Sequence, residues 1–301
     1  MKHILITGAA GYIGSHLVKK MLVNNYKISV ILRKTTDIST LLEYWNKITV
    51  YYDEGTIQDI TEFMKKQGVD CVVHLATHYI TYHKAEDIDE MLDSNVRFGT
   101  RLLEAMKLAG VKYIIYSRTS WQHYKDEAFN PVNLYAAMKQ SFEDVMKYYT
   151  QAEDIYSTTL EIYDTYGEND HRSKIVNLMK RCVTTGEWIK LSPGEQKLDY
   201  LYIDDVTEAF FVAICNLEIQ EEKETEYALR TESIHSLREV VETFERIYNT
   251  KLNVEWGKFE YRPREIFVPY RGLPSLINWK AKYNLHDGFL SMYQREMEAK
   301  K

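Results

Sequence analysis

The 301-residue sequence contains only three cysteines (Cys71, Cys182 and Cys215) and only five prolines. An odd number of thiols at these spacings fits neither a disulfide framework nor a zinc site, so we expect no metal. Cys71 and Cys215 stand in apolar runs and are expected to be buried. The sequence also lacks a signal-peptide pattern and any run near the roughly 20 apolar residues that cross a bilayer. These absences favour a cytoplasmic protein without a membrane partner.

The sequence has no excess of positive charge either. Its net charge is −6, which argues against a protein that binds nucleic acid by neutralising phosphates. The hydrophobic fraction of 45% and the charged fraction of 27% are ordinary for a globular chain. The length suits one large domain or two unequal ones.

The first half of the chain alternates short β-branched or aromatic runs with helical stretches, which predicts an α/β fold with a doubly wound parallel sheet. After about residue 165 this pattern changes, so we expect a dinucleotide-binding domain in 1–165 and mainly a substrate-binding region in 166–301. Within the latter, 218–226 reads as a solvated acidic loop, and Ser236 with Glu239 matches a capping box. The predicted strands are 3–7, 27–32, 48–52, 70–75, 112–117 and 156–163, and the predicted helices include 56–67, 87–109, 133–151 and 171–185.

A glycine-rich turn follows the first predicted strand, where Gly8, Gly11 and Gly14 are spaced three apart. Gly8 permits a tight bend, Gly11 lets the main chain approach a pyrophosphate, and Gly14 lets the next helix lie close to the strand. That helix begins near Tyr12 and Ile13 and points its N-terminus at the ligand. The sequence therefore predicts a dinucleotide site at this turn.

A tyrosine and a lysine, Tyr135 and Lys139, stand four residues apart at the start of a later helix and share one face. A free phenol has a pKa of about 10, and a nearby ammonium together with an oxidised nicotinamide would lower it. Thr119, at the end of the preceding strand, can hydrogen-bond the reacting substrate oxygen. We interpret these three residues as a proton-transfer site.

Together these segments resemble the extended short-chain dehydrogenase/reductases, the NAD-dependent epimerase/dehydratase family, which have a Rossmann fold and act on nucleotide sugars. The resemblance implies that Thr119, Tyr135 and Lys139 are catalytic, and that Leu75 and Ala76 line the cofactor with Thr77 on the substrate side. It also implies that Asn95 braces the central helices and that Arg262 holds the substrate diphosphate. The matching segments are 7–16, 74–77, 95–100, Tyr135 with Lys139, 166–170, 199–206 and 262–263.

Departures from the family pattern narrow the expected reaction. The second strand ends at Leu32 and is followed by Arg33 and Lys34, not by the acidic residue that binds a ribose 2′-hydroxyl. This favours NADP(H) over NAD(H), with Arg33 and Lys34 at the 2′-phosphate. In 4,6-dehydratases a carboxylate pair follows the catalytic threonine, whereas this chain has Ser120 and Trp121, which argues against dehydration unless Asp126 or Glu127 loops back into the site.

Other departures fall on the substrate side. Asp164 stands where the family has an amide, and Leu198 replaces an arginine, for which Lys197 or Arg172 would compensate at the diphosphate. The segment 181–210 resembles the CDP-abequose and CDP-paratose synthases, which are NADPH-dependent reductases of a 4-keto-deoxysugar nucleotide.

The sequence thus predicts an NADPH-dependent 4-ketoreductase of a nucleotide-activated deoxysugar, with a CDP-sugar favoured. An NAD-dependent nucleotide-sugar 4-epimerase and a non-catalytic NADP-binding regulatory protein are the alternatives. In this family, the helices that match 90–109 and 133–151 pair across a two-fold axis, so a homodimer is expected. Met91, Leu92, Phe142 and Met146 are candidates for that interface or for the internal core.

Overall fold

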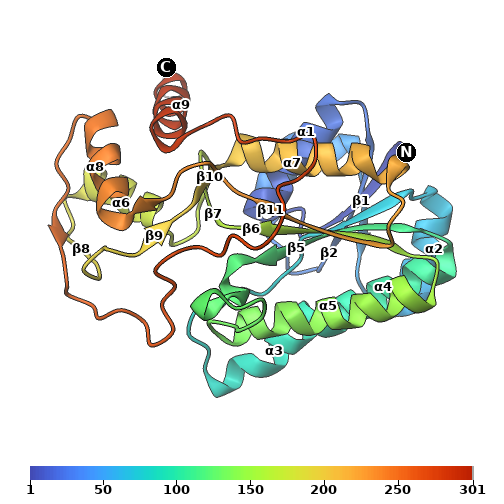
Figure 1. Cartoon of the computed structure of the whole chain (residues 1–301). Coiled ribbons are helices and arrows are strands. Elements are labelled where there is room, and N and C mark those ends of the chain that lie inside the picture. The colour runs from blue at the N-terminus through green and yellow to red at the C-terminus, as the bar shows by residue number, and fades with distance from the viewer. Residues whose placement is uncertain (300–301) are drawn as a thin grey trace.

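The computed structural model describes residues 1–299, and its centre is a seven-stranded parallel sheet (Figure 1). The strand order is β11-β6-β5-β4-β1-β2-β3. Successive strands are added on one side of β1 up to β3 and on the other side from β4 onward, as in a doubly wound sheet. The predicted α/β class is therefore confirmed. The strands are β1 (His3–Thr7), β2 (Lys27–Leu32), β3 (Ile48–Tyr52), β4 (Cys71–His74), β5 (Tyr113–Thr119), β6 (Tyr156–Ile162) and β11 (Glu224–Leu229).

Helices cover both faces of this sheet because its strands are apolar on both sides. On β1, Ile4 and Ile6 belong to the core beneath α1 (Tyr12–Val23) and α7 (Ile203–Asn216), whereas Leu5 belongs to the core on the opposite face. The opposite face is covered by α2 (Ile57–Gln67), α4 (Phe98–Ala109) and α5 (Leu134–Ala152) (Figure 1). The switch point between the two helical layers leaves the carboxyl ends of β1 and β4 open to a ligand.

The helix predicted over 87–109 is interrupted in the structure. It consists of α3 (Ile88–Leu92), a π-helical turn (Asp93–Arg97) and α4. Asn95 lies in the π-helical turn, where its Oδ1 accepts hydrogen bonds from Thr77 Oγ1 (2.7 Å) and the His78 amide (2.8 Å). π-helical turns are frequent at functional sites, and this one fixes the loop that follows β4.

Apart from α7 and β11, which return to the central sheet, the chain beyond β6 builds a smaller region of helices and short strand pairs at the carboxyl edge of the sheet (Figure 1). The predicted capping box is present, because Ser236 Oγ accepts from the Glu239 amide at 3.2 Å. The elements are α6 (Ile175–Thr185), α8 (Leu237–Ile247), α9 (Leu285–Glu298), and the pairs β7 (Asp164–Tyr166) with β10 (Tyr200–Tyr202), β8 (Ile189–Lys190) with β13 (Val254–Glu255), and β9 (Lys197–Leu198) with β12 (His235–Ser236).

Three predictions about this part of the chain were wrong. The acidic stretch 218–226 is not only a surface loop, because its end enters strand β11 and pairs with β6 from Glu224 onward. The helix predicted from residue 171 begins at Ile175. Cys215 is exposed near the end of α7, whereas Cys71 and Cys182 are buried thiols.

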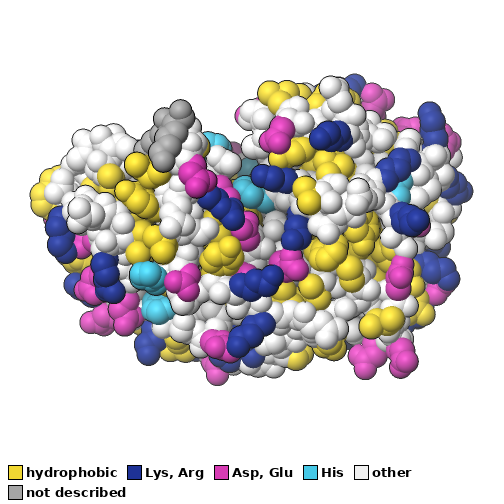
Figure 2. Space-filling view, turned by 90° about the horizontal axis from the view of Figure 1, so that it is seen from above, with side chains coloured by type: hydrophobic (Ala, Val, Ile, Leu, Met, Phe, Trp, Pro, Cys, Tyr) yellow, Lys and Arg dark blue, Asp and Glu magenta, His cyan; other side chains and the backbone are white. Residues whose placement is uncertain are grey.

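The surface carries mixed charge. Figure 2 looks onto the side of α1 and α7, where acidic and basic side chains are interspersed and hydrophobic ones are scattered between them. Within residues 1–299, none of the helices is long and apolar enough to cross a membrane.

Candidate active site

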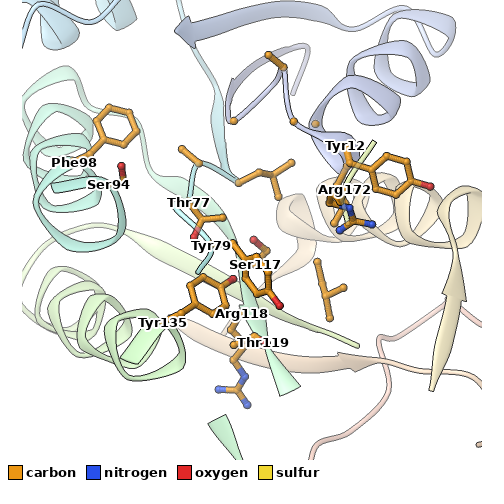
Figure 3. A pocket seen from close by; sticks show the side chains of 18 of the residues that line it. Tyr12, Thr77, Tyr79, Ser94, Phe98, Ser117, Arg118, Thr119, Tyr135 and Arg172 are labelled. Atoms are coloured by element: carbon orange, nitrogen blue, oxygen red, sulfur yellow. The ribbon is translucent and has the colours of Figure 1, made fainter. Parts of the chain in front are cut away.

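A cavity of about 1100 Å³ lies beyond the carboxyl ends of β1, β2, β4 and β5. This is where open parallel sheets bind their ligands. The glycine turn, the loop after β4, the end of β5 and the start of α5 all contribute to its lining (Figure 3). The fold thus brings most of the predicted cofactor residues, though not Lys34 or Lys139, and two of the three predicted catalytic residues to the lining of one cavity.

The glycine turn is shaped by close backbone contacts. Gly8 has a φ of +70°, and a Cβ there would lie 2.6 Å from both the Leu75 carbonyl carbon and the Ala76 nitrogen. A Cβ on Gly14 would lie 2.1 Å from the Gly8 oxygen. On Gly11 the nearest atom to a Cβ is the Gly8 oxygen at 3.2 Å, so this glycine keeps the cavity side open. Tyr12 and Ile13 also line the cavity, and the set fits a dinucleotide pyrophosphate.

Charged residues surround the end of the cavity near β2. Arg33 lines it and forms an exposed ion pair with Glu90 at 3.3 Å, whereas Lys34 is paired with Glu54 and is not among the lining residues that the structure describes. Asp53 also lines the cavity but is bound by Arg101 and by the Gly55 amide at 2.9 Å. The predicted Leu75 and Ala76 line the middle of the cavity.

Tyr135 and Thr119 both line this cavity (Figure 3). Tyr135 is in the first turn of α5, and its ring packs edge-on against Tyr79 with centroids 5.0 Å apart. Thr119 ends β5, and its Oγ1 accepts a hydrogen bond from the Trp121 amide at 3.3 Å. The predicted substrate residue Thr77 lines the same space.

Lys139 lies one helical turn after Tyr135 and is buried, with 2% of its surface exposed. Its Nζ sits 4.0 Å from the centroid of the Tyr116 ring, and it is not among the described residues that line the cavity. Burial lowers the pKa of Lys139 to about 7, while the Glu143 carboxylate opposes that shift. Near neutral pH, the Lys139 ammonium can therefore lose a proton and the neutral amine can take one up.

The pKa of Tyr135 differs from the expected direction. In the protein alone, burial raises it to about 12, and the hydrogen bond with Thr77 only partly offsets this. The expected lowering by Lys139 is not seen here, because the desolvation of the phenolate dominates. Tyr135 is thus protonated at neutral pH, as an acid that protonates a substrate oxygen must be.

A second cavity of about 620 Å³ adjoins the first. Lys197 and Arg262 line it, as the sequence suggested for the substrate side, and Asp164 lines both cavities. The Arg262 guanidinium lies 4.7 Å from the centroid of the Trp121 ring. Arg172 lines only the first cavity, where it contacts the Tyr12 ring at 4.3 Å and Asp170 at 2.8 Å.

Three residues that sequence reasoning did not propose as ligand contacts, Tyr79, Trp121 and Lys174, line both cavities. The Lys174 Nζ lies 5.2 Å from the centroid of Tyr79 and 5.7 Å from that of Trp121, and 3.3 Å from Asp164. The position of Trp121, two residues after Thr119, was a usable signal. Tyr79 and Lys174 have no comparable motif. Within residues 1–299, no three His, Cys, Asp or Glu side chains gather as a metal site would require.

Comparison with known proteins identifies the family. The sequence model of the NAD dependent epimerase/dehydratase family matches residues 4–227. The chain is 31% identical over 267 residues to the CDP-abequose synthase of Yersinia pseudotuberculosis, covering 88% of this chain and 91% of that protein. The chain belongs to the NAD dependent epimerase/dehydratase family. It is thus an oxidoreductase of the extended short-chain dehydrogenase/reductase type, as predicted.

Other members of the family carry out related reactions on nucleotide sugars. The chain is 25% identical to the dTDP-4-dehydro-6-deoxyglucose reductase of Escherichia coli over 302 residues, covering 95% of this chain and 94% of that protein. Its fold matches a UDP-glucose-4-epimerase from Stenotrophomonas maltophila, solved with bound NAD and a formylated UDP-arabinopyranose, with a TM-score of 0.85 at 19% identity and full coverage of both chains. These relatives are named for activities on nucleotide sugars, and the likeness in fold extends over the whole chain.

Proposed function

We propose that this enzyme is an NADPH-dependent reductase of the 4-keto group of a nucleotide-activated deoxysugar, and that a CDP-sugar is preferred. One observation carries the proposal. Tyr135 and Thr119 line the same cavity as the glycine turn, and that cavity shares Trp121, Lys174 and Asp164 with a second, cation-lined cavity. A sugar beside Tyr135 and Thr119 would thus extend its nucleotide toward Arg262 and Lys197.

Each side chain has a distinct task in this reaction. A bound nicotinamide would supply the hydride to the sugar C4. Thr119 would hold the carbonyl oxygen by a hydrogen bond, and the neutral Tyr135 phenol would donate its proton to the developing alkoxide. The Lys139 ammonium would then restore that proton through the cofactor ribose, for which its pKa of about 7 is well placed.

The preference for NADPH rests on which charges near β2 are free to bind. Asp37 lines the cavity but accepts hydrogen bonds from the amide (2.9 Å) and hydroxyl (3.1 Å) of Ser39, and Asp53 is bound by Arg101. Among the residues that the structure describes, the Arg33 side chain is paired only with Glu90, in an exposed contact that a 2′-phosphate dianion can displace. Lys34, which is exposed, would contribute at longer range.

The substrate assignment rests on the second cavity. We propose that the region 166–301 mainly binds substrate, with Arg262 and Lys197 at the diphosphate and Asp164 at the sugar. Arg172, which lies beside Tyr12, would act nearer the cofactor. Similarity to a CDP-abequose synthase supports a CDP-sugar, and Trp121 lacks the proton-transferring carboxylate of a dehydratase.

We also propose a homodimer formed by α3, α4 and α5. Of the apolar residues expected there, Met91, Phe142 and Met146 are buried in the subunit core, while Leu92 is 41% exposed. Tyr148 on α5 and Leu108 on α4 are exposed as well. Light scattering at micromolar concentration tests this assembly.

The function is tested by reacting the purified enzyme with NADPH and a panel of CDP-, UDP-, GDP- and dTDP-linked 4-keto-6-deoxy sugars. We expect one NADPH oxidised per sugar reduced, with NADPH favoured over NADH and CDP-sugars over the rest. Calorimetry with the free nucleoside diphosphates on the NADPH-saturated protein identifies the base separately. Interconversion of sugars without net NADPH oxidation would indicate the NAD-dependent 4-epimerase. Cofactor binding without turnover of any sugar would indicate a regulatory binding protein.

A further inference from the structure

A guanidinium from the second half of the chain lies against the helix that begins at the glycine turn. Arg172 belongs to the segment 167–174, which joins β7 to α6. Its guanidinium carbon lies 4.3 Å from the ring centroid of Tyr12, the first residue of α1. Figure 3 shows these two side chains together, apart from Tyr135 and Thr119. The chain beyond the central strands thus places a cation beside the glycine turn.

Two residues hold the Arg172 side chain in one orientation. Its Nε and Nη2 donate to the two carboxylate oxygens of Asp170, each at 2.8 Å, and its amide donates to Asp170 Oδ1 at 3.0 Å. Nη2 also donates to Thr165 Oγ1 at 2.9 Å and to the Thr165 carbonyl oxygen at 3.0 Å. The Asp170 side chain is only 2% exposed, so water rarely competes for this pair. A guanidinium that is already ordered loses little conformational entropy when it binds a ligand.

The same side chain still has hydrogen-bond donors for a ligand. Within residues 1–299, its hydrogen bonds use only Nε and Nη2, so the two N–H groups of Nη1 have no acceptor there. Arg172 lines the first cavity and not the second, and its side chain is 36% exposed. Since guanidinium N–H groups bind the oxygens of anions strongly, the group that Arg172 binds should be an anion in the first cavity.

The position of Arg172 at the glycine turn indicates which anion this is. Tyr12 directly follows Gly11, which begins α1 without a side-chain cap, and the first turn of α1 contains no acidic residue. Its free amides and the positive end of the helix dipole therefore attract the pyrophosphate of a dinucleotide. The two other phosphate sites lie elsewhere, with the 2′-phosphate at Arg33 after β2 and the substrate diphosphate at Arg262 in the second cavity.

We propose that Arg172 binds the pyrophosphate of the cofactor, so that the second half of the chain completes the dinucleotide site. Because Asp170 neutralises the guanidinium, Arg172 contributes directed N–H donors and not an excess of positive charge. This role requires a bound dinucleotide, as the NAD dependent family implies, and does not require the proposed 4-keto reduction. It assigns Arg172 to the cofactor and not to the substrate diphosphate.

The test is a calorimetric titration of the full-length protein with NADPH, NADH, adenosine 2′-phosphate and CDP. The double variant Asp170→Asn/Arg172→Gln removes both members of the ion pair, so it leaves no buried unpaired carboxylate and keeps the net charge of the protein. It should bind NADPH and NADH about tenfold or more weakly, as the loss of hydrogen bonds to a charged group does. Its affinities for adenosine 2′-phosphate, which has no pyrophosphate, and for CDP should equal those of wild type.

Two single variants are the controls. Asp170→Asn keeps the guanidinium and should bind both dinucleotides at least as tightly as wild type; a loss equal to that of the double variant would overturn the proposal. Arg33→Met should show a different pattern, with weaker binding of NADPH and adenosine 2′-phosphate and unchanged binding of NADH. Equal losses of NADPH and NADH in Arg33→Met would refute the proposed NADPH preference and leave the role of Arg172 standing.

Three results for the folded double variant would overturn the role of Arg172. They are wild-type affinity for both dinucleotides, a loss confined to CDP, which would place Arg172 at the substrate diphosphate, and an equal loss for adenosine 2′-phosphate, which would indicate a general defect of the cavity. Thermal unfolding without ligand shows whether the double variant is folded. If it is not, Arg172→Lys, whose single ammonium cannot serve Asp170 and the pyrophosphate together, should show the same selective loss, and wild-type binding of both dinucleotides by this variant would overturn the proposal.

Discussion

Replacing Gly11 and Gly14 separately by alanine distinguishes a glycine needed by the ligand from one needed by the fold. Gly11 has φ −74° and ψ 172°, which alanine adopts without strain. A Cβ there meets only the Gly8 oxygen, at 3.2 Å. Gly14 is buried, and a Cβ would lie 2.1 Å from the Gly8 oxygen and 2.7 Å from the Ala9 Cα.

The expected stability changes follow from these contacts. Gly11→Ala requires the Gly8 oxygen to shift by a few tenths of an ångström, which destabilises the folded state slightly. A stiffer unfolded chain usually raises the free energy of unfolding by about 0.4–1 kcal/mol, so the net change should be near zero. For Gly14→Ala, the backbone of α1 must separate from that of the turn at Gly8 and Ala9 by about an ångström, which costs about 3 kcal/mol or more. That is a large part of a typical stability of about 5–15 kcal/mol.

Thermal unfolding with and without NADPH measures both effects. Gly11→Ala should unfold at the wild-type temperature without cofactor and lose most of the cofactor-induced increase, because its methyl group occupies the path of the pyrophosphate. Gly14→Ala should unfold at least about 5 °C lower even without cofactor. Wild-type cofactor binding by Gly11→Ala would refute the placement of the pyrophosphate. Wild-type stability of Gly14→Ala would refute the close packing of α1 on the turn that follows β1.

Three further predictions concern the cavities. Tyr135→Phe should bind NADPH like wild type but lose about 100-fold to 10,000-fold in kcat, as the loss of a general acid does; a fully active variant would contradict its role. Trp121→Ala should lower kcat/KM for the deoxysugar nucleotide about tenfold through lost apolar contact and leave the KM for NADPH unchanged; a change in the cofactor KM alone would contradict the placement. Since the pKa of Lys139 is about 7 in the folded protein and about 10.4 in an unfolded chain, the unfolded state binds more protons between these values. The contribution of Lys139 to the unfolding free energy should therefore rise by up to about 1.4 kcal/mol per pH unit above pH 7. Urea unfolding of Lys139→Met from pH 7 to 9 should lack this rise, and parallel curves for the two proteins would show that Lys139 titrates normally.

The parallel strands were predictable because they are short, apolar on both faces and separated by amphipathic helices. The first three predicted strands match β1, β2 and β3 residue for residue. Strand β11 was missed for a physical reason. It is the edge of the sheet, so Glu224 and Glu226 remain partly exposed, and its sequence reads like a solvated loop.

Some residues of the candidate site were likewise predictable from the sequence, and others were not. Gly8, Gly14 and Tyr135 were found because local geometry limits which residues fit a tight turn or one helix face. Tyr79 and Lys174 reach the cavities from segments far apart in the chain, and only the fold brings them to Trp121. Likewise, no spacing within one segment reveals that Arg118 on β5 meets Glu143 on α5 and Glu226 on β11.

The fold explains how carboxylates near the candidate site are accommodated. The register of β5 and β6 places Arg118 directly opposite Glu161. Asp164 stands where the family has an amide, and Lys174 lies 3.3 Å away. Each of these carboxylates therefore has a cation beside it and is not an isolated charge. Arg118 and Glu161 are both buried, and since a buried carboxylate without its partner is strongly destabilising, these two residues must be retained together. Neither member of such a pair can be assessed from its own position in the sequence.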